Sequence, residues 1–384
     1  MTVPNGYPEQ VLRLREELVP AMRGLLGRGL SESFMRQCVR IGEFQTYAGG
    51  LKADLVGGLT LNLNAVIKLG GEEIDAHARL MNAVNARRER TFVEVLESVE
   101  LPHDRWLLLM ADLKNHSTLF DLVYHKKTPA RLLERAIDKT FQGLRACHEL
   151  KPDSGLKFPV TTDPFTPRIR PKLVEAVRND PALAPMLDNP GTVRGLPCPP
   201  LNKLLADLEH WLHETMPHAP GVLVHGDPHL RNVMARQYGN GLAVRFIDPN
   251  PDFGYTDPVY DLGKLLHFAE PVGWALVNPE LCGADWQPRS GQWLLSASLN
   301  NAPVHAERRR AMIEREIRWH IVSLACARAP AFEARLHVAR ASAHLGLLSL
   351  FGGPEAAEAS RFVLAHALEA LARWNATITS TEVV

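Results

Sequence analysis

The sequence lacks the features that mark several classes of protein. Its five cysteines are odd in number, widely scattered and never spaced as a CxxC pair, so they give no support to a cysteine-based zinc site or redox couple. This usage fits a reducing cytoplasm. There is no apolar run of about 18 residues, and the N-terminus has no basic segment followed by an apolar core. We therefore expect neither a membrane span nor a signal peptide.

An excess of charge of one sign is also missing. The chain has 43 basic and 43 acidic residues, so its overall balance favours neither nucleic acid nor an anionic membrane surface as a partner. A charged substrate would have to be recognised locally. What is present is a chain of 384 residues with 46% hydrophobic content, enough for one bilobal unit or two domains.

The spacing of apolar residues changes along the first part of the chain. Helical spacing over residues 8–38 predicts that the chain begins with helices. Segments rich in β-forming residues and separated by glycines follow over 44–69, and they predict three antiparallel strands. A helix is expected over 72–87, and further strands over 92–100 and 105–113. These elements predict a five-stranded sheet with one inserted helix.

The rest of the chain is mostly helical in pattern. Helical periodicity is clear over residues 129–149 and 201–215, and it dominates 306–375. Residues 151–200 are rich in proline and are expected to be irregular, and long loops of this kind are usually functional or mobile. The chain is therefore predicted to divide near residue 112.

One polar cluster directly follows a short apolar run, in the segment VLVHGDPHLRNVM over residues 222–234. Asn232 comes five residues after Asp227, and a hairpin signal at 239–241 leads into a strand that is expected to end on Asp248. This hairpin would bring the three side chains to one end of a two-stranded ribbon. Kinase-type phosphoryl transfer uses this spacing, because one carboxylate accepts the proton of the attacking hydroxyl while the amide and second carboxylate hold Mg²⁺.

Upstream segments supply the other parts of a kinase site. The segment AVIK ends at Lys68 and matches the strand lysine that binds nucleotide phosphates. Gly49 and Gly50 lie where a phosphate-binding loop between the first two strands is expected. The backbone from Met110 to Leu113 is expected to form the hinge that holds the base.

With these motifs, the sequence resembles the aminoglycoside phosphotransferase and choline kinase-like family over about residues 44–270. The family's HGDxHxxN loop is matched by His225, Gly226, Asp227, His229 and Asn232. Its Ile-Asp metal motif is matched by Ile247 and Asp248, and its D-P-x-x-D-L element by Asp257, Pro258, Asp261 and Leu262. The resemblance implies an α+β, bilobal protein-kinase-like fold. A small β-rich lobe would cover residues 1–111, and a larger helical lobe would cover 112–384 with the catalytic loop at 225–232.

The resemblance also implies roles for the matched residues in the helical lobe and the metal site. Asp227 would be the catalytic base, and His229 would face the transferred phosphate. Asn232 and Asp248 would be the metal ligands. His225 and Asp261 would brace the catalytic loop.

Other implied roles concern the nucleotide and the acceptor. Lys68 would bind the nucleotide phosphates, but the glutamate that pairs with it in the family is replaced here by His77, so the partner of the lysine stays open. Trp274 lies where the family places part of its acceptor pocket. Asp252 and Asp257 could recognise a cationic acceptor, or they could be ordinary turn residues.

Other interpretations of the same residues exist. His225, Asp227 and His229 could form a zinc site like the H-x-D-x-H arrangement of some zinc hydrolases, although this leaves the asparagine and the second aspartate unexplained. Taken singly, Lys68 could be an exposed lysine and Asp248 a turn residue.

The resemblance implies a Mg²⁺-dependent kinase that transfers the γ-phosphoryl group of ATP or GTP to a hydroxyl of an antibiotic such as an aminoglycoside. A metabolic kinase for a sugar, choline-like or nucleoside hydroxyl is the alternative within the same class. A catalytically silent kinase-like binding module is the alternative from another class. A protein substrate is not expected, because no D-F-G and A-P-E framing of an activation loop is found.

Overall fold

The computed structural model describes ten stretches of the chain, and the helices predicted over residues 8–38 lie outside them. These stretches are residues 39–40, 46–54, 60–88, 90–101, 104–125, 127–152, 155–216, 221–329, 331–351 and 356–381. The contacts of the chain divide it into two compact units: Met1–His116 with Arg245–Pro251, and Ser117–Val244 with Asp252–Val384. None of the described helices is both long enough and apolar enough to span a membrane.

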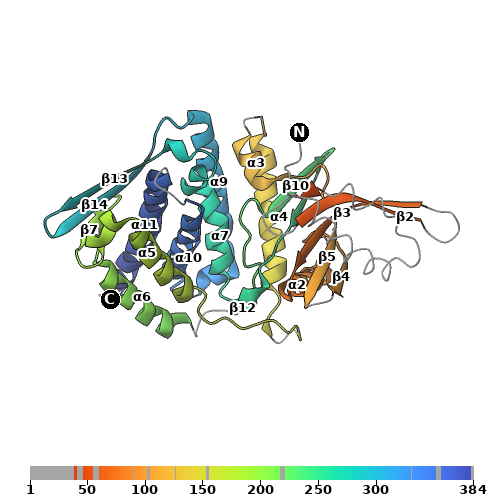
Figure 1. The fold of residues 1–384 in the computed structure, drawn as a ribbon, viewed down its shortest axis with the longest axis horizontal. Helices are drawn as coiled ribbons and strands as arrows, with labels where there is room; N and C mark the ends of the chain where they lie inside the picture. The colour runs from red at the N-terminus through yellow and green to blue at the C-terminus, as the bar shows by residue number, and fades with distance from the viewer. Residues whose placement is uncertain are drawn as a thin grey trace. The chain divides into compact units, whose positions relative to one another are not determined.

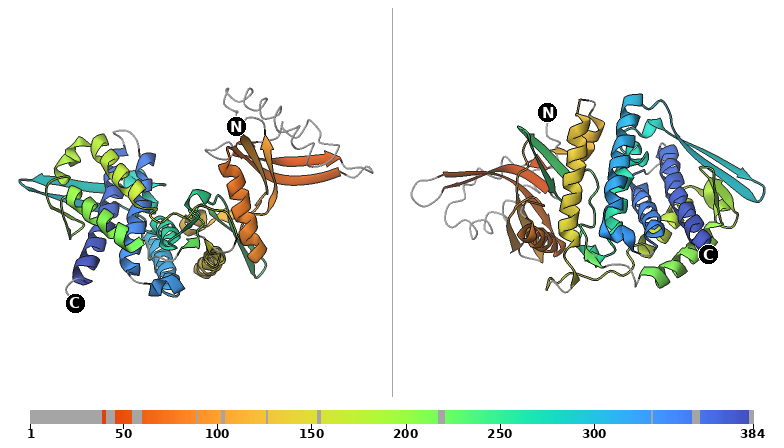
Figure 2. Two further views of the ribbon diagram at one scale, coloured as in Figure 1. Left: turned by 90° about the horizontal axis from the view of Figure 1, so that it is seen from below. Right: turned by 180° about the vertical axis from the view of Figure 1, so that it is seen from behind.

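The described residues of the first unit form an antiparallel sheet and one helix (Figures 1 and 2). The sheet order is β1-β2-β3-β5-β4. The strands are β1 (Val39–Arg40), β2 (Thr46–Asp54), β3 (Thr60–Gly70), β4 (Val95–Leu101) and β5 (Arg105–Ala111). Helix α2 (Glu73–Arg87) packs against β4 and β5 through a buried face that includes Leu80 and Val84. A five-stranded sheet with a helix after β3 is present, as predicted. Only two of its strands fall within 44–69, however, where three were predicted, and the fifth is β1, which was not predicted.

The strand boundaries within 44–69 differ from the prediction. Gly49 and Gly50 lie inside β2, where they pair with Ala65 and Asn64 of β3. The prediction that these glycines form a loop between two strands is therefore wrong. Residues 55–59 connect β2 to β3 and lie outside the described residues. Two predicted strands merge into β3, because the alternation of apolar and polar residues in TLNLN runs without a turn signal into AVIKLG.

The second unit is mostly helical. Its helices are α3 (Leu119–Tyr124), α4 (Ala130–His148), α5 (Thr166–Asn179), α6 (Leu201–Thr215), α7 (Val259–Ala269), α8 (Val272–Ala275), α9 (Val304–Val322), α10 (Phe332–Gly346) and α11 (Ala357–Thr381). Helix α10 packs against both α7 and α11 (Figure 1). Apolar side chains such as Val338 and Phe362 are fully buried there. The helices predicted over 129–149 and 201–215 correspond to α4 and α6.

Short sheets complete the second unit. One has the order β13-β14-β7-β8. A second has the order β11-β10-β6, and a third pairs β12 with β9. The strands are β6 (Ser117–Thr118), β7 (Gly191–Val193), β8 (Leu196–Cys198), β9 (Val222–Leu223), β10 (Val233–Tyr238), β11 (Gly241–Phe246), β12 (Tyr255–Thr256), β13 (Cys282–Arg289) and β14 (Gln292–Leu299). Strands β13 and β14 form a long hairpin (Figure 2).

The segment 151–200 is more regular than predicted. It contains α5, a 3-10 helix over Pro181–Met186, and the pair β7 and β8. Proline at the start of a helix is compatible with helical geometry, and Pro171 lies only one turn further on. The prolines therefore lie at the start of helices or shortly after it, and they do not exclude regular structure here.

The hairpin of β10 and β11 follows the polar segment, as predicted. Strand β11 ends at Phe246, two residues before Asp248. Its first four residues belong to the second unit and its last two, Arg245 and Phe246, belong to the first. Asp227 is therefore part of the second unit, whereas Asp248 is part of the first.

Candidate active site

The backbone of the segment 225–232 is held by helix α7. Asp261, in the first turn of this helix, is fully buried. Its two carboxylate oxygens accept hydrogen bonds from the backbone N–H groups of His225 and Gly226, each at 2.9 Å. His148 Nε2, from α4, lies 3.0 Å from the same carboxylate. Gly226 has φ +81°, a left-handed conformation that favours glycine, so the sequence HGD suits this turn.

The carboxylate of Asp227 faces Lys264, a lysine of α7. Lys264 Nζ lies 3.0 Å from Asp227 Oδ1, and His229 Nε2 lies 3.6 Å from Oδ2. Burial acts to raise the pKa of Asp227, but the charge of Lys264, followed by that of His229, outweighs burial and lowers the pKa to about 2. The carboxylate is therefore ionised at neutral pH, with one oxygen beside an ammonium group.

His225 and Asn232 fix the ends of the same segment. The Nδ1 atom of the buried His225 accepts a hydrogen bond from the backbone N–H of Asp227 at 3.2 Å. The side-chain amide of Asn232 donates to the carbonyl oxygen of Asp227 at 3.0 Å. Because the NH₂ group of Asn232 faces a carbonyl, its amide oxygen is the atom that could ligate a cation.

His229 is packed into the apolar surface of α7. Its ring centroid lies 4.8 Å from that of Phe268. Burial lowers the pKa of His229 despite the nearby carboxylate of Asp227, so the imidazole is neutral at pH 7. It can donate a hydrogen bond to a phosphate but does not supply a positive charge.

The zinc interpretation of the two histidines is not supported. Within the described part of the chain, no group of three or more His, Cys, Asp or Glu side chains is arranged to hold a metal ion. The Nδ1 atom of His225 is occupied by a backbone N–H, and Asp227 is paired with Lys264.

Lys68 lies in the first unit and has two partners. Its Nζ is 3.0 Å from Asp248 Oδ1 and 3.2 Å from His77 Nδ1. The lysine is buried, whereas 48% of the Asp248 side chain is exposed. His77, on α2, thus contacts the lysine from the position where a glutamate was expected. An imidazole can accept this hydrogen bond only when its Nδ1 is unprotonated.

Asp248 adopts a backbone conformation that few residues tolerate. Its φ is +49°, and Asp and Asn are among the few non-glycine residues that populate this region. One carboxylate oxygen faces Lys68, and the side chain is half-exposed. A carboxylate oxygen here and the amide oxygen of Asn232 are hard oxygen donors of the kind that Mg²⁺ prefers. The residues present therefore fit that ion.

The remaining predicted residues occupy varied positions. Met110 is a buried residue of β5 that pairs with Val66 of β3. Leu113 follows β5, and its carbonyl oxygen accepts the backbone N–H of His116. Gly49 and Gly50 lie within β2, as described above.

The residues predicted to bind the acceptor differ in accessibility. Asp252 is exposed. Asp257 is fully buried, and its carboxylate pairs with Arg335 and accepts the backbone N–H of Val259, which leaves it no exposed oxygen for a cationic acceptor. Trp274 lies in α8, and its side chain is outside the described part of the structure.

Two functional candidates were missed by the sequence analysis. Lys264 contacts Asp227, and it follows Asp261 by three residues on α7, so both side chains lie on one face of the helix. That spacing is the only signal that could have indicated it. Arg168, on α5, stacks against aromatic rings next to α7. Nothing in the sequence marks this arginine.

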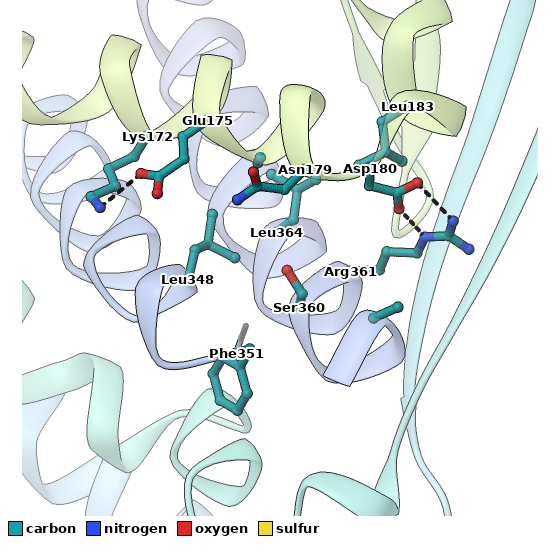
Figure 3. Close-up of a pocket in the computed structure, with 12 residues that line it drawn as sticks. Lys172, Glu175, Asn179, Asp180, Leu183, Leu348, Phe351, Ser360, Arg361 and Leu364 are labelled. Carbon is teal, nitrogen blue, oxygen red and sulfur yellow. Dashed lines mark hydrogen bonds and ion pairs between the residues drawn. The ribbon is translucent and has the colours of Figure 1, made fainter. Parts of the chain in front are cut away.

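A cavity of about 550 Å³ lies elsewhere in the second unit, between α5, the 3-10 helix and α11 (Figure 3). Two ion pairs flank its apolar lining: Lys172 with Glu175, at 2.9 Å, and Arg361 with Asp180, at 2.6 Å. No residue of the segment 225–232 lines it. Its charged groups neutralise one another, so we do not assign it to the reaction.

The fold and these clusters define the class of the protein. A β-rich unit joined to a mostly helical unit that carries an HGDxHxxN loop is the kinase-like fold of the aminoglycoside phosphotransferases. The model of the phosphotransferase enzyme family matches residues 72–294, more than half of the chain. The chain belongs to this family and is a phosphotransferase with an alcohol group as acceptor.

Several solved structures are similar to the chain. A protein from Ralstonia eutropha JMP134, described as a candidate aminoglycoside phosphotransferase, shares 14% identity with a TM-score of 0.51, covering 92% of this chain and 96% of its own. A ternary complex of a thermostable mutant of aminoglycoside phosphotransferase APH(4)-Ia with AMP-PNP and hygromycin B shares 16% identity with a TM-score of 0.49, covering 88% and 94%. Macrolide 2′-phosphotransferase MphH from Brachybacterium faecium shares 12% identity with a TM-score of 0.41, covering 94% and 98%. No curated protein matches the sequence. At these identities, the likeness concerns the fold.

Proposed function

We propose that the chain is a Mg²⁺-dependent small-molecule kinase that transfers the γ-phosphoryl group of ATP or GTP to a hydroxyl of its acceptor. The observation that supports this most directly is the state of Asp227. Its carboxylate is ionised, bound to Lys264 through one oxygen, and carried by a loop whose backbone is fixed by Asp261. Such a group is suited to align an acceptor hydroxyl.

Asp227 would contribute to the reaction more by orienting the acceptor hydroxyl than by acting as a strong base. A carboxylate with a pKa of about 2 is a weak base, but phosphoryl transfer passes through a loose transition state in which the protein mainly positions groups and stabilises charge. Asp227 would orient the hydroxyl and accept its proton late in the reaction. His229, neutral at pH 7, would donate a hydrogen bond to the transferred group.

The nucleotide would be bound through its phosphates and its base. Lys68 would bind its phosphates, with His77 and Asp248 holding the ammonium group in place. Asn232 and Asp248 would hold Mg²⁺, which offsets the negative charge of the phosphates when bound. The backbone between Met110 and Leu113 would bind the base. Gly49 and Gly50 lie inside β2, so any contact that they make with the phosphates would come from the backbone of this strand and not from a loop.

The acceptor is proposed to be a small hydroxyl compound, either an antibiotic or a metabolite such as a sugar. An antibiotic acceptor would make the protein a resistance enzyme that acts in the cytoplasm, where ATP and GTP are available. The match to the phosphotransferase family spans residues 72–294, which include the segment 225–232 and Asp248 but not Lys68, and it supports both possibilities.

The experiment is a nucleotide-turnover screen across hydroxylated antibiotics, sugars and amino alcohols, with Mg²⁺ present and absent. We expect turnover with at least one acceptor, dependence on Mg²⁺, and a loss of about 1,000-fold or more in Asp227→Asn, which keeps the size of the side chain. The control is Asp188→Asn, which changes an exposed aspartate that pairs with Asn202. Tight nucleotide binding without turnover on any acceptor would instead support the silent binding module.

A further inference from the structure

An arginine next to α7 has no carboxylate partner among the described residues. Arg168, in the first turn of α5, is half-buried. Its guanidinium carbon lies 5.5 Å from the ring centroid of Phe253 and 6.0 Å from that of Tyr260. These two rings stack with their centroids 4.2 Å apart. Cation–π contacts hold the guanidinium in one place, and they leave its N–H donors available.

Neighbouring arginines behave differently. Arg170, two residues further along α5, forms a bidentate pair with Glu209, and Arg361 forms one with Asp180. A planar guanidinium matches a carboxylate or a phosphate in this two-point geometry. Arg168 therefore carries, without a carboxylate partner among the described residues, the same recognition group that Arg170 and Arg361 use in ion pairs.

Tyr260 provides a second, independent indication of a ligand. Its side chain is 2% exposed, and its hydroxyl has no hydrogen-bond partner within the described structure. A buried hydroxyl without a partner is costly, so this group calls for a specific explanation, and a bound molecule that accepts or donates the missing hydrogen bond is one. Burial raises the pKa of Tyr260, and the charges of Arg168, Asp227 and Asp261 also act on it. The hydroxyl is thus within electrostatic reach of both Arg168 and the catalytic-loop carboxylate.

Three acidic groups around α7 have arginine or lysine partners, whereas Asp252 is exposed. In the described structure the pairs are Asp227 with Lys264, Asp257 with Arg335, and Glu270 with Arg318 and Arg340. An aminoglycoside carries several ammonium groups, which would need unpaired carboxylates. The charge distribution favours an acceptor of the opposite sign.

We propose that Arg168 and the hydroxyl of Tyr260 form an acceptor subsite that binds an anionic group of a small hydroxyl compound. The group is a phosphate or a carboxylate, held by the guanidinium in two-point geometry and by the tyrosine O–H. This inference rests on the proposed kinase function, which it makes more specific. The acceptor would be a phosphorylated or acidic sugar, or a compound of similar charge.

The test is calorimetric binding to the full chain, with AMP-PNP and Mg²⁺ at saturating concentration so that the nucleotide site is filled. The probes are a hexose monophosphate, a uronic acid, the neutral hexose and an aminoglycoside. We expect at least one anionic probe to bind. Binding of the hexose monophosphate would identify the recognised group as a phosphate, and binding of the uronic acid would identify it as a carboxylate. Arg168→Gln is expected to weaken this binding about tenfold or more, Tyr260→Phe by less, and Arg168→Lys to retain part of it.

Arg170→Gln is the matched control, because it removes a guanidinium from the same helix that is already paired with Glu209. It is expected to leave binding unchanged. Failure of both anionic probes to bind, tighter binding of the aminoglycoside, or full affinity in a folded Arg168→Gln variant would overturn the subsite. Arg168-dependent binding without phosphoryl transfer would retain the subsite and reject the kinase function. If phosphoryl transfer to an aminoglycoside occurs and Arg168→Gln does not affect it, the kinase function is retained and the subsite is rejected.

Discussion

At the scale of single residues, the contact between Lys264 and Asp227 sets the behaviour of the catalytic-loop carboxylate. Burial favours the protonated acid, and the ammonium group 3.0 Å away favours the carboxylate. The effect of the ammonium group is the larger, so the pKa of Asp227 is lowered. Lys264 also occupies one carboxylate oxygen, so the second oxygen, beside His229, is left for the acceptor hydroxyl.

Replacing Lys264 by methionine keeps the apolar stem and removes the charge. We expect kcat to fall about 100-fold with little change in the KM for the nucleotide, because the change affects the alignment of Asp227 and not nucleotide binding. The acid limb of the pH–rate profile should move to higher pH, because the largest effect that lowers the pKa of Asp227 is lost. Steady-state kinetics from pH 5 to 9 measure kcat, and an acid limb that enters this range in the variant, but not in the wild type, shows the raised pKa.

Lys264→Arg should restore part of kcat because it retains the charge. The control is Lys172→Met, which removes a lysine that pairs with Glu175 away from the loop. An unchanged kcat and pH profile in Lys264→Met would show that the ion pair has no role in the reaction.

His77 contacts Lys68 from the position where the sequence resemblance led us to expect a glutamate. A carboxylate would hold the ammonium group at least as well as a neutral imidazole, since it adds an ionic attraction. We predict that His77→Glu keeps or lowers the KM for the nucleotide, whereas His77→Lys raises it about tenfold or more through repulsion of Lys68. Kinetics at saturating acceptor measure this. An equal KM in all three proteins would mean that His77 does not position the lysine.

Single residues were predictable from the sequence only where a short motif fixes their spacing. Asp227 and Asn232 lie in one such motif, and Asp248 follows from the hairpin after it. Arg168 could not be predicted, because its position depends on how α5 packs beside the rings of Phe253 and Tyr260. That packing is a long-range property which local periodicity does not encode.

At the scale of elements, α7 supports the catalytic loop at two points. Asp261 holds the loop backbone and Lys264 holds the carboxylate of Asp227, from positions one helical turn apart. A rotation or shift of this helix would therefore change both contacts together.

Asp261→Ala removes the acceptor of two buried N–H groups and of His148. We predict a loss of about 3 kcal/mol in the free energy of unfolding, since two or more hydrogen bonds to a charged group are lost and their donors stay buried. Asp261→Asn should cost less because one oxygen remains. Urea unfolding followed by circular dichroism measures the loss. A change below about 0.5 kcal/mol in the alanine variant would contradict the supporting role.

Elements with strong periodicity were predicted well, and those with mixed composition were not. Helices α4 and α6 follow clear helical spacing and were found at nearly the right residues. The hairpin of β13 and β14 was missed, because Pro288 and several polar residues weaken its alternation. Its turn is nevertheless marked by Gly291, which has φ +71°. In β2, the paired glycines look like a turn in the sequence, but long-range pairing with β3 makes them part of a strand.

At the scale of the whole molecule, the helical unit is joined by a buried charge network around Glu270, at the end of α7. This carboxylate is 2% exposed and pairs with Arg318 of α9, and with Arg340 and His344 of α10. Burial alone would raise its pKa, but the charge of Arg340 and then the contact with His344 hold it well below the usual range. Three helices are thus connected through one side chain.

Because the folded-state pKa of Glu270 is depressed, its stabilisation is complete above the ordinary pKa of a glutamate and is lost as the pH falls through the folded value. We predict that Glu270→Gln lowers the free energy of unfolding at pH 7 by about 3–5 kcal/mol. The difference from the wild type should shrink between pH 5 and pH 3. Urea unfolding at several pH values measures this, with Glu175→Gln as a surface control. A difference that stays constant with pH would rule out this linkage.

The division of β11 between the two units limits how the protein can be engineered. Its first four residues belong to the helical unit, while Arg245 and Phe246 lead directly to Asp248 in the β-rich unit. A chimera that exchanges only the N-terminal portion with a relative would separate Lys68 from the aspartate with which it pairs. Productive recombination therefore needs three junctions, near residues 116, 245 and 251, and not one.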